Sequence, residues 1–406
     1  MAVLCIIVFV GMLGFGIILP LFPFYAERLG AGPEVITWTM AAFTLGQFVA
    51  TPLWGRLSDA VGRRPVLVLT VLGSAISYVV LAFASELWVV IASRVFGGMM
   101  AGNVSTALAY VGDITTEKSR SAGMGKLGAA LGMGFIFGPA FGGLLAGSEV
   151  ETANYVRPAL AAAVISLVAM FGTLLFVKES LDAAHRKPLF GRREAGSPVQ
   201  RPAGVNRGAL IKLLAVAMGF FIAMSLMESI FPLWANDAFG MGPRNIGGVF
   251  FVLGSISAIV QGLLIGRLTD RFGERRIAAV AGALFGLGLA ILAAAGSSWQ
   301  IWVGLVPFAV GIGLFNPTVS SLVSKTAAPN ARGAVMGQYQ AASALGRVVG
   351  PGVSGILYAQ IGLAAPFSLA AVIMLPVLLL VGTVRLRDVA GAAVGANSFA
   401  TEDDRD

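Results

Sequence analysis

The sequence predicts an all-α membrane protein in which twelve transmembrane helices form two pseudo-symmetric six-helix bundles. Hydrophobic residues make up 57% of the 406-residue chain and charged residues 12%, which is about half the charged share of a soluble protein. Apolar stretches of about 20 residues, long enough to cross a hydrocarbon core, recur along nearly the whole chain. Landmarks of the first half return about 212 residues later, which indicates a duplicated bundle.

Twelve apolar segments account for the predicted helices, at 2–25, 35–54, 66–84, 88–112, 122–146, 157–177, 209–235, 244–265, 277–295, 300–323, 333–359 and 365–384. The first has no basic flank and no small-residue cleavage site, so we expect a retained helix. A break at 178–208, rich in charge, Pro and Gly, divides an N-terminal bundle at 1–177 from a C-terminal bundle at 209–387. The tail at 388–406 is expected to be disordered in the cytoplasm.

The distribution of Lys and Arg sets the expected orientation. If both termini are cytoplasmic, most of the 28 Lys and Arg residues lie in or beside inside loops, as the positive-inside rule requires. The net charge of +8 is then explained by basic residues that meet anionic lipid headgroups of the cell (inner) membrane, and it does not indicate binding of nucleic acid. With one Cys and one His, the chain offers neither an enzyme's nucleophile–base pair nor a metal cluster. It has no GxxxxGK[ST] loop of an ATP-driven pump.

Two kinds of motif carry the internal repeat. "GRLSDAVGRRP" at 55–65, read as a loop between spans two and three, returns as "GRLTDRFGERR" at 266–276. "GPAFGG" at 138–143 in the fifth span returns as "GPGVSG" at 350–355 in the eleventh. Glycines allow a loop to turn tightly and helices to approach closely. The predicted helix-packing surface of the fifth span, bent at its proline, consists of Gly134, Gly138, Pro139, Gly142 and Gly143.

Four motifs in order resemble the major facilitator superfamily. "GRLSDAVGRRP" resembles its signature loop, and "ASRVFGGMMAG" at 92–102 resembles its fourth-helix motif. "GFIFGPAFGG" at 134–143 resembles the fifth-helix motif of the drug–proton antiporter branch, and "GFGIILPLFP" at 14–23 is similar to the first helix of tetracycline-efflux-like members. The resemblance covers the chain to about residue 387. It implies a monomeric secondary transporter in the lipid bilayer, with a small-molecule substrate, the proton as coupling ion and no other cofactor.

A transporter that alternates between two faces needs a cytoplasmic contact that can form and break. Asp59 is expected to attract the N-terminus of span eleven, and Arg63 to pair with Asp113. Charge-assisted bonds of about 1–3 kcal/mol each would favour the outward-facing state without freezing it; the alternative is that these charges only fix topology. The second copy is expected to be weaker because Glu274 replaces the arginine. The predicted latch residues are Gly55, Arg56, Asp59, Gly62, Arg63, Arg64, Asp113 and Asp270.

Three ionisable residues lie well inside predicted spans, where each costs at least about 2.5–3.5 kcal/mol and is a functional candidate. Glu228 is the expected proton site because its apolar neighbours favour the protonated form; a substrate contact or a fixed ion pair is the alternative. Arg347 is its candidate counter-charge or a partner for an anionic substrate group. The resemblance implies a part in proton coupling for Arg94, although pairing with backbone carbonyls explains it as well. Asp113 is a further coupling candidate.

A substrate pocket is expected between the halves, near the membrane midplane. Aromatic, Met and amide side chains with few fixed charges suit lipophilic or amphipathic molecules of varied shape. Helix packing explains each residue singly, so only the set predicts a pocket. The set is Asn103, Tyr110, Phe220, Met224, Glu228, Phe231, Asn316, Gln338, Tyr339 and Arg347.

One departure from the family bears on the substrate. Tetracycline-efflux-like members carry an acidic residue early in span one, where this chain has Gly11. This counts against transport of tetracycline and of divalent-metal chelates, but leaves proton coupling to Glu228. The expected function is proton-coupled efflux of lipophilic or amphipathic small molecules. Export or uptake of a defined metabolite such as a sugar, amino acid or lipid is the alternative, and a sensor or channel is disfavoured.

Overall fold

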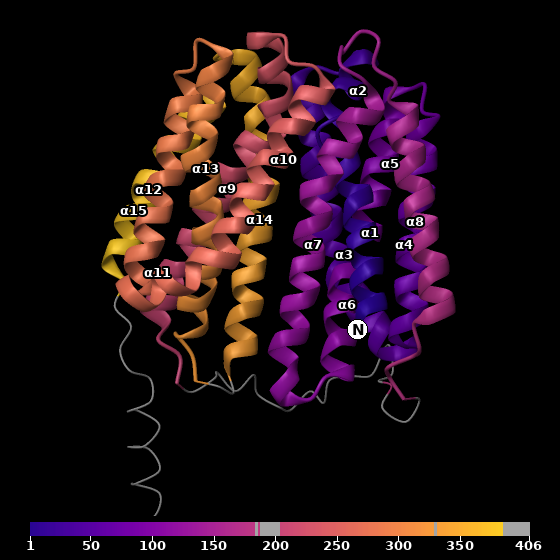
Figure 1. Ribbon diagram of the computed structural model, residues 1–406, viewed down its shortest axis with the longest axis vertical. Helices are drawn as coiled ribbons and strands as arrows, with labels where there is room; N and C mark the ends of the chain where they lie inside the picture. Colours follow the sequence, from indigo (N-terminus) through magenta and orange to yellow (C-terminus); the bar gives the residue numbers. More distant parts are fainter. Residues whose placement is uncertain (183–185, 187–203, 329–330, 385–406) are drawn as a thin grey trace, which may run out of the picture. The chain divides into compact units, whose positions relative to one another are not determined.

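The computed structural model describes residues 1–182, 186, 204–328 and 331–384, and over these ranges the regular secondary structure is helical (Figure 1). The predicted tail at 388–406 and most of the predicted central loop lie outside the described residues. The described helices agree with the predicted spans to within a few residues at nearly every boundary. An all-α membrane fold was therefore predictable from apolar segment length.

Eight helices precede the central loop: α1 (Ala2–Ile18), α2 (Phe22–Arg28), α3 (Pro33–Val61), α4 (Arg63–Ala82), α5 (Leu87–Met100), α6 (Asn103–Ile114), α7 (Glu117–Ala146) and α8 (Val156–Phe176). The helices that follow it are α9 (Arg207–Phe239), α10 (Pro243–Ile259), α11 (Ile265–Phe272), α12 (Glu274–Ala293), α13 (Ser298–Ser324), α14 (Arg332–Gln360) and α15 (Ala365–Thr383). A π-helical turn, Val260–Leu264, joins α10 to α11.

Nine described helices or helix pairs are long and apolar enough to cross a membrane, or ten if the pair α1 and α2, bent by 41°, forms one span. Both α3 and α14 contain 29 residues, about 43 Å at 1.5 Å per residue. Their sequences mix apolar residues with Thr, Gln, Ser and Gly. The prediction of twelve spans therefore rests on length alone for these two helices.

The described residues form two compact units. The first contains the described residues up to 186, Leu226–Ser255 and Pro351–Pro366. The second contains residues 204–225, Ile256–Gly350 and residues 367–384. Because α9, α10 and α14 contribute to both units, the units differ from the sequence halves at 1–177 and 209–387. The halves remain a prediction from the sequence repeat.

In the first unit, α1 packs against both α7 and α8, and glycines of α7 allow the close approach. A Cβ atom added at Gly138 would lie 2.6 Å from the Cα atom of Gly16, and one added at Gly134 would lie 2.7 Å from the carbonyl oxygen of Phe9. Gly142 meets the backbone of Ile17 in the same way. The predicted packing surface on the fifth span is present, because only hydrogen fits at these positions.

The stretch at 55–65, predicted as a loop, is helical. Both Gly55 and Arg56 lie inside α3, which continues to Val61, and Gly62 alone separates it from α4. Open space surrounds a Cβ atom at Gly55, so the prediction of a turn there was wrong. Gly62 has a φ of 114°, and Gly273 has a φ of 80° at the equivalent junction of α11 and α12. Such angles favour glycine, and each repeat therefore has a one-residue helix break.

Candidate functional site

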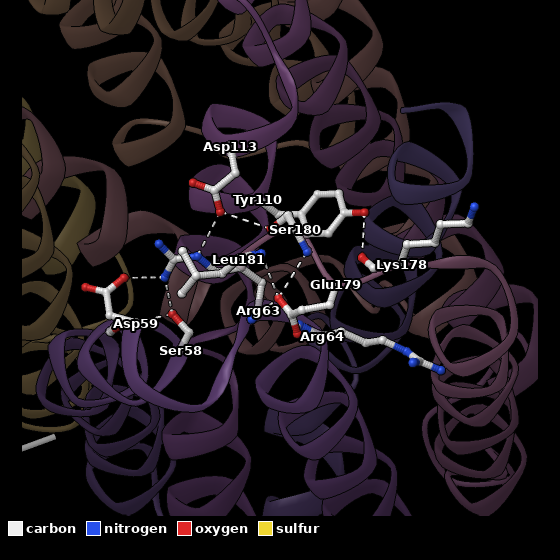
Figure 2. Close-up of polar contacts among 11 residues, drawn as sticks. Ser58, Asp59, Arg63, Arg64, Tyr110, Asp113, Lys178, Glu179, Ser180 and Leu181 are labelled. Atoms are coloured by element: carbon white, nitrogen blue, oxygen red, sulfur yellow. Dashed lines mark hydrogen bonds and ion pairs between the residues drawn. The ribbon is translucent and has the colours of Figure 1, made fainter. Parts of the chain in front are cut away.

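A polar cluster surrounds the break between α3 and α4; we call this end of the first unit, marked by Gly62 and Asp113, the motif end (Figure 2). The Nη1 atom of Arg63 lies 2.5 Å from Asp59 Oδ1 and donates to Ser58 Oγ at 2.7 Å. The Nε atom of Arg63 donates to Asp113 Oδ2 at 3.1 Å. The predicted Arg63–Asp113 pair is therefore present. Since the Arg63 side chain is only 10% exposed, salt screens this pair less than a surface pair.

A carboxylate that the sequence analysis missed caps α4. Glu179 follows α8, and its Oε1 and Oε2 atoms accept hydrogen bonds from the backbone N–H groups of Arg63 at 2.8 Å and Arg64 at 3.1 Å. The first N–H groups of a helix have no partner within the helix, and the helix dipole favours an anion there. Glu179 supplies that anion, whereas the Arg63 side chain brings a positive charge to the same terminus.

The start of the central loop is part of this cluster (Figure 2). The Ser180 hydroxyl donates to Asp113 Oδ2 at 3.0 Å, and the Tyr110 hydroxyl donates to the carbonyl oxygen of Lys178 at 2.9 Å. Tyr110 also belongs to a buried apolar cluster that includes Leu67 and Leu127. These contacts give Tyr110 a packing role, and its substrate contact stays a prediction. They also fix residues 178–181 against the helix break.

The second repeat has an ion pair of opposite polarity. Glu274, at the position of Arg63, begins α12, and its Oε1 atom lies 2.8 Å from Lys325 Nζ and accepts from Ser321 Oγ at 2.6 Å. Lys325 lies 212 residues after Asp113, so both charges are exchanged. The expectation of a weaker second contact took account of the arginine that Glu274 replaces, but not of the ion pair that Glu274 forms with Lys325. Arg56 and Asp270, also predicted in the latch, are exposed, and the predicted contact of Asp59 with α14 stays a prediction.

We expect Gly62→Ala to destabilise the protein more than Gly273→Ala, although both positions have a positive φ. The shared cost of placing a Cβ atom on these backbone angles, which essentially only glycine adopts, is about 1–3 kcal/mol. A Cβ atom at Gly62 would additionally collide with the Glu179 carboxylate, whereas nothing lies within 4 Å of one at Gly273. Thermal unfolding of the two purified variants in detergent measures the difference. Equal losses in Tm would show that Glu179 contributes nothing to the junction.

Arg94, on α5, is buried with 5% of its surface exposed. Its Nη2 atom donates to Ser77 Oγ at 3.2 Å, and its guanidinium carbon lies 5.5 Å from the ring centre of Tyr78 and 5.9 Å from that of Phe43. A hydroxyl and two aromatic faces thus replace the backbone carbonyls considered from the sequence. Its Nε atom is buried without a hydrogen-bond partner among the described residues. Cation–π contacts offset part of the cost of burying this charge.

Two other candidates, Glu228 and Arg347, belong to different units. Glu228 is half-buried on the part of α9 that belongs to the first unit. Arg347, in the second unit, is exposed and lies over the Phe221 ring at 4.7 Å from its centre. A direct Glu228–Arg347 pair therefore stays a prediction. In the second unit, the Tyr339 hydroxyl donates to Asn316 Oδ1 at 2.5 Å, which joins two predicted pocket residues.

The remaining pocket candidates fall into two classes. Phe220 and Phe231 are at most 1% exposed; the ring of Phe220 stacks on that of Phe315 at 4.1 Å between centres. Their contacts describe helix packing, and substrate contact stays a prediction. The other candidates are accessible: Asn103 and Met224 are half-buried, and Gln338 is exposed. A Cβ atom at Gly11 would lie 4.0 Å from Asn103 Nδ2.

At the end of the first unit opposite the motif end, which we call the distal end, α7 and α10 pack backbone to backbone. A Cβ atom at Gly143 would lie 2.5 Å from the carbonyl oxygen of Pro243. One at Gly247 would collide with the carbonyl oxygen of Pro139. The proline of the fifth-span motif therefore lies against a helix from beyond the central loop, which the sequence did not reveal.

Helices α3 and α14 meet at the distal end in a similar way. A Cβ atom at Gly355 would collide with Thr37, which is fully buried. Nearby, the Tyr358 hydroxyl donates to Asp237 Oδ2 at 2.5 Å, and Glu27 on α2 lies close enough to Asp237 for the two charges to repel. Six helices, α2, α3, α7, α9, α10 and α14, thus contribute to the packed distal end of this unit from both sides of the central loop.

The long apolar helices of the described residues are those of a multi-pass membrane protein. The sequence matches the family model of the Major Facilitator Superfamily over residues 4–267 and 250–400, so the chain belongs to that superfamily. It is 28% identical to Multidrug resistance protein 2 of Bacillus subtilis (strain 168), over 91% of this chain and 90% of that one. It is 30% identical to Tetracycline resistance protein, class G, of Vibrio anguillarum, over 85% and 87%.

Further similarities are to a human relative and to solved transporter structures. The chain is 32% identical to human Major facilitator superfamily domain-containing protein 10, over 84% of this chain and 77% of that one. The crystal structure of the human organic anion transporter MFSD10 (TETRAN) superposes with a TM-score of 0.71 at 25% identity, covering 94% of this chain and 98% of that one. A POT family transporter in complex with 5-aminolevulinic acid has a TM-score of 0.77 at 16% identity and covers 94% of this chain and 96% of that one; it supports the fold alone.

Proposed function

We propose that this transporter is a proton-coupled exporter of lipophilic or amphipathic small molecules that works by alternating access. The similarity to a multidrug resistance protein over nine tenths of both chains carries the proposal. Two features of the molecule support it. A half-buried carboxylate, Glu228, lies within an apolar span, and a polar cluster at the motif end offers contacts that can form and break.

In the proposed cycle, Glu228 binds and releases the coupling proton, and Arg94 and Asp113 are the further coupling candidates. Substrate binds near the membrane midplane between the halves, where Asn103, Met224, Gln338 and Arg347 have accessible side chains. The Arg63 cluster stabilises one of the two conformations. Both termini lie in the cytoplasm and the protein acts as a monomer in the cell (inner) membrane. The motif end is then cytoplasmic and the distal end faces outward.

Transport of organic anions is the second candidate function. The similarity to the human organic anion transporter MFSD10 favours it. So does Arg94, a buried cation whose described neighbours are a hydroxyl and aromatic rings rather than a carboxylate. An amphipathic carboxylate would bring the missing negative charge toward this side chain, whereas a lipophilic cation would be repelled by it.

The purified protein in liposomes with a trapped pH dye tests the proposal. Lipophilic cations, amphipathic organic anions, sugars and amino acids are added in turn, and proton movement is recorded. We expect proton movement with amphipathic compounds and none with sugars. A response to organic anions alone would select the second candidate function. If no compound moves protons while labelled substrate still crosses the membrane, the proton is not the coupling ion.

A further inference from the structure

The two helix breaks carry ion pairs of reversed polarity at equivalent positions. In the first repeat, Arg63 is the first residue of α4 and Asp113 lies in the last turn of α6. In the second repeat, Glu274 is the first residue of α12 and Lys325 follows the last residue of α13. The charged atoms lie 3.1 Å apart in the first pair and 2.8 Å apart in the second. Contact is thus retained while both charges are exchanged.

The reversal of charge between the two ion pairs matters because helix ends are not electrically neutral. A helix N-terminus favours negative charge and a C-terminus favours positive charge. Glu274 and Lys325 therefore each lie at a favourable helix end. Arg63 and Asp113 each lie at an unfavourable one, so the first pair opposes the two dipoles that the second pair complements.

The first repeat compensates with groups from outside its own helices. Glu179 caps the N-terminus of α4, and the Ser180 hydroxyl donates to Asp113, both from the stretch that follows α8. In the second repeat, Glu274 accepts from Ser321 and pairs with Lys325, and both partners come from α13 or its end. The first pair therefore shares hydrogen bonds with residues 178–181, while the second is completed by adjacent helices.

We propose that the reversed polarity gives the two contacts different roles: Glu274–Lys325 is a permanent tie between α12 and α13, and Arg63–Asp113 is a releasable contact controlled by the docking of residues 178–181. When Glu179 leaves, the N-terminus of α4 loses the anion that caps its N–H groups, and the Arg63 charge there is balanced by Asp59 and Asp113 alone. Residues 178–181 are then regulators of the contact. The use of this release in transport rests on the proposed function, but the difference in stability does not.

Hydrogen exchange of the full-length protein in detergent, without substrate, tests this proposal. We expect Glu179→Gln to speed amide exchange about tenfold in the first turn of α4, as for a lost helix cap, and also in the last turn of α6. If exchange at α6 is unchanged, docking does not control the Arg63–Asp113 contact and that part of the proposal is wrong.

The double variant Glu274→Lys/Lys325→Glu tests polarity itself, because it retains an ion pair but opposes both dipoles. We expect exchange in the first turn of α12 to rise about tenfold, with the first repeat unchanged. Protection equal to wild type would overturn the proposal, because polarity would then have no effect on stability. Neither measurement needs transport, so a failure of the proposed function leaves this test intact.

Discussion

Glu228→Gln is expected to abolish substrate-dependent proton movement while leaving exchange of labelled substrate across the liposome membrane intact. Glutamine has nearly the shape of glutamate but cannot bind and release a proton near neutral pH. If Glu228 carries the coupling proton, the dye signal falls to that of liposomes without protein. Exchange of substrate between equal concentrations needs no net proton transfer, and it persists because the binding surface keeps its shape.

The two readouts separate the alternatives for this residue. Loss of both proton movement and exchange would assign Glu228 to substrate binding or to a fixed ion pair. If the Glu228→Gln variant retains both proton movement and exchange, the coupling proton is assigned to Asp113 or to Arg94 and its surroundings. Glu149→Gln is the matched control, because Glu149 is an exposed carboxylate in the loop between α7 and α8. It should leave both signals at the wild-type level.

The positions of the helices along the chain were largely predictable from the sequence, because membrane spans are set by apolar length. The helix breaks at Gly62 and Gly273 were located correctly, but the turns were predicted too wide. Residues 56–61 contain no helix breaker, and Gly55 alone does not end a helix whose neighbouring residues favour it. The charged stretch is therefore the end of α3, with a turn of one residue.

The contacts that the sequence did not predict come from remote segments. Glu179 lies 116 residues after Arg63, in a polar stretch without periodicity, so nothing in the sequence joins the two. The second ion pair was missed for another reason. Comparison of the repeats looked for identical residues, and an exchange of both charges removes identity at Glu274 and Lys325 while it retains complementarity. A search for exchanged charges at offsets of both 211, for Glu274, and 212, for Lys325, would have found it.

Leucine in place of Gly247 is expected to stop transport by holding the distal end apart. A side chain there would occupy the position of the Pro139 carbonyl oxygen. That oxygen belongs to the backbone and cannot turn aside as a flexible side chain could. Overpacking costs about 1–3 kcal/mol, which shifts a two-state equilibrium about 5- to 150-fold. Because the proposed alternating access requires the distal end to open and close in every cycle, the transport rate is expected to fall with the population of the closed state.

Gly248→Leu is the matched control, because nothing lies within 4 Å of a Cβ atom at the neighbouring Gly248. A single cysteine reports on the distal end directly. The native Cys5 is replaced by serine and Thr37, fully buried where α3 meets α14, by cysteine. A membrane-impermeant thiol reagent should label this cysteine faster with Gly247→Leu than with Gly248→Leu. Equal labelling together with lost transport would mean that Gly247→Leu disturbs α10 locally, and that packing at the distal end does not govern access.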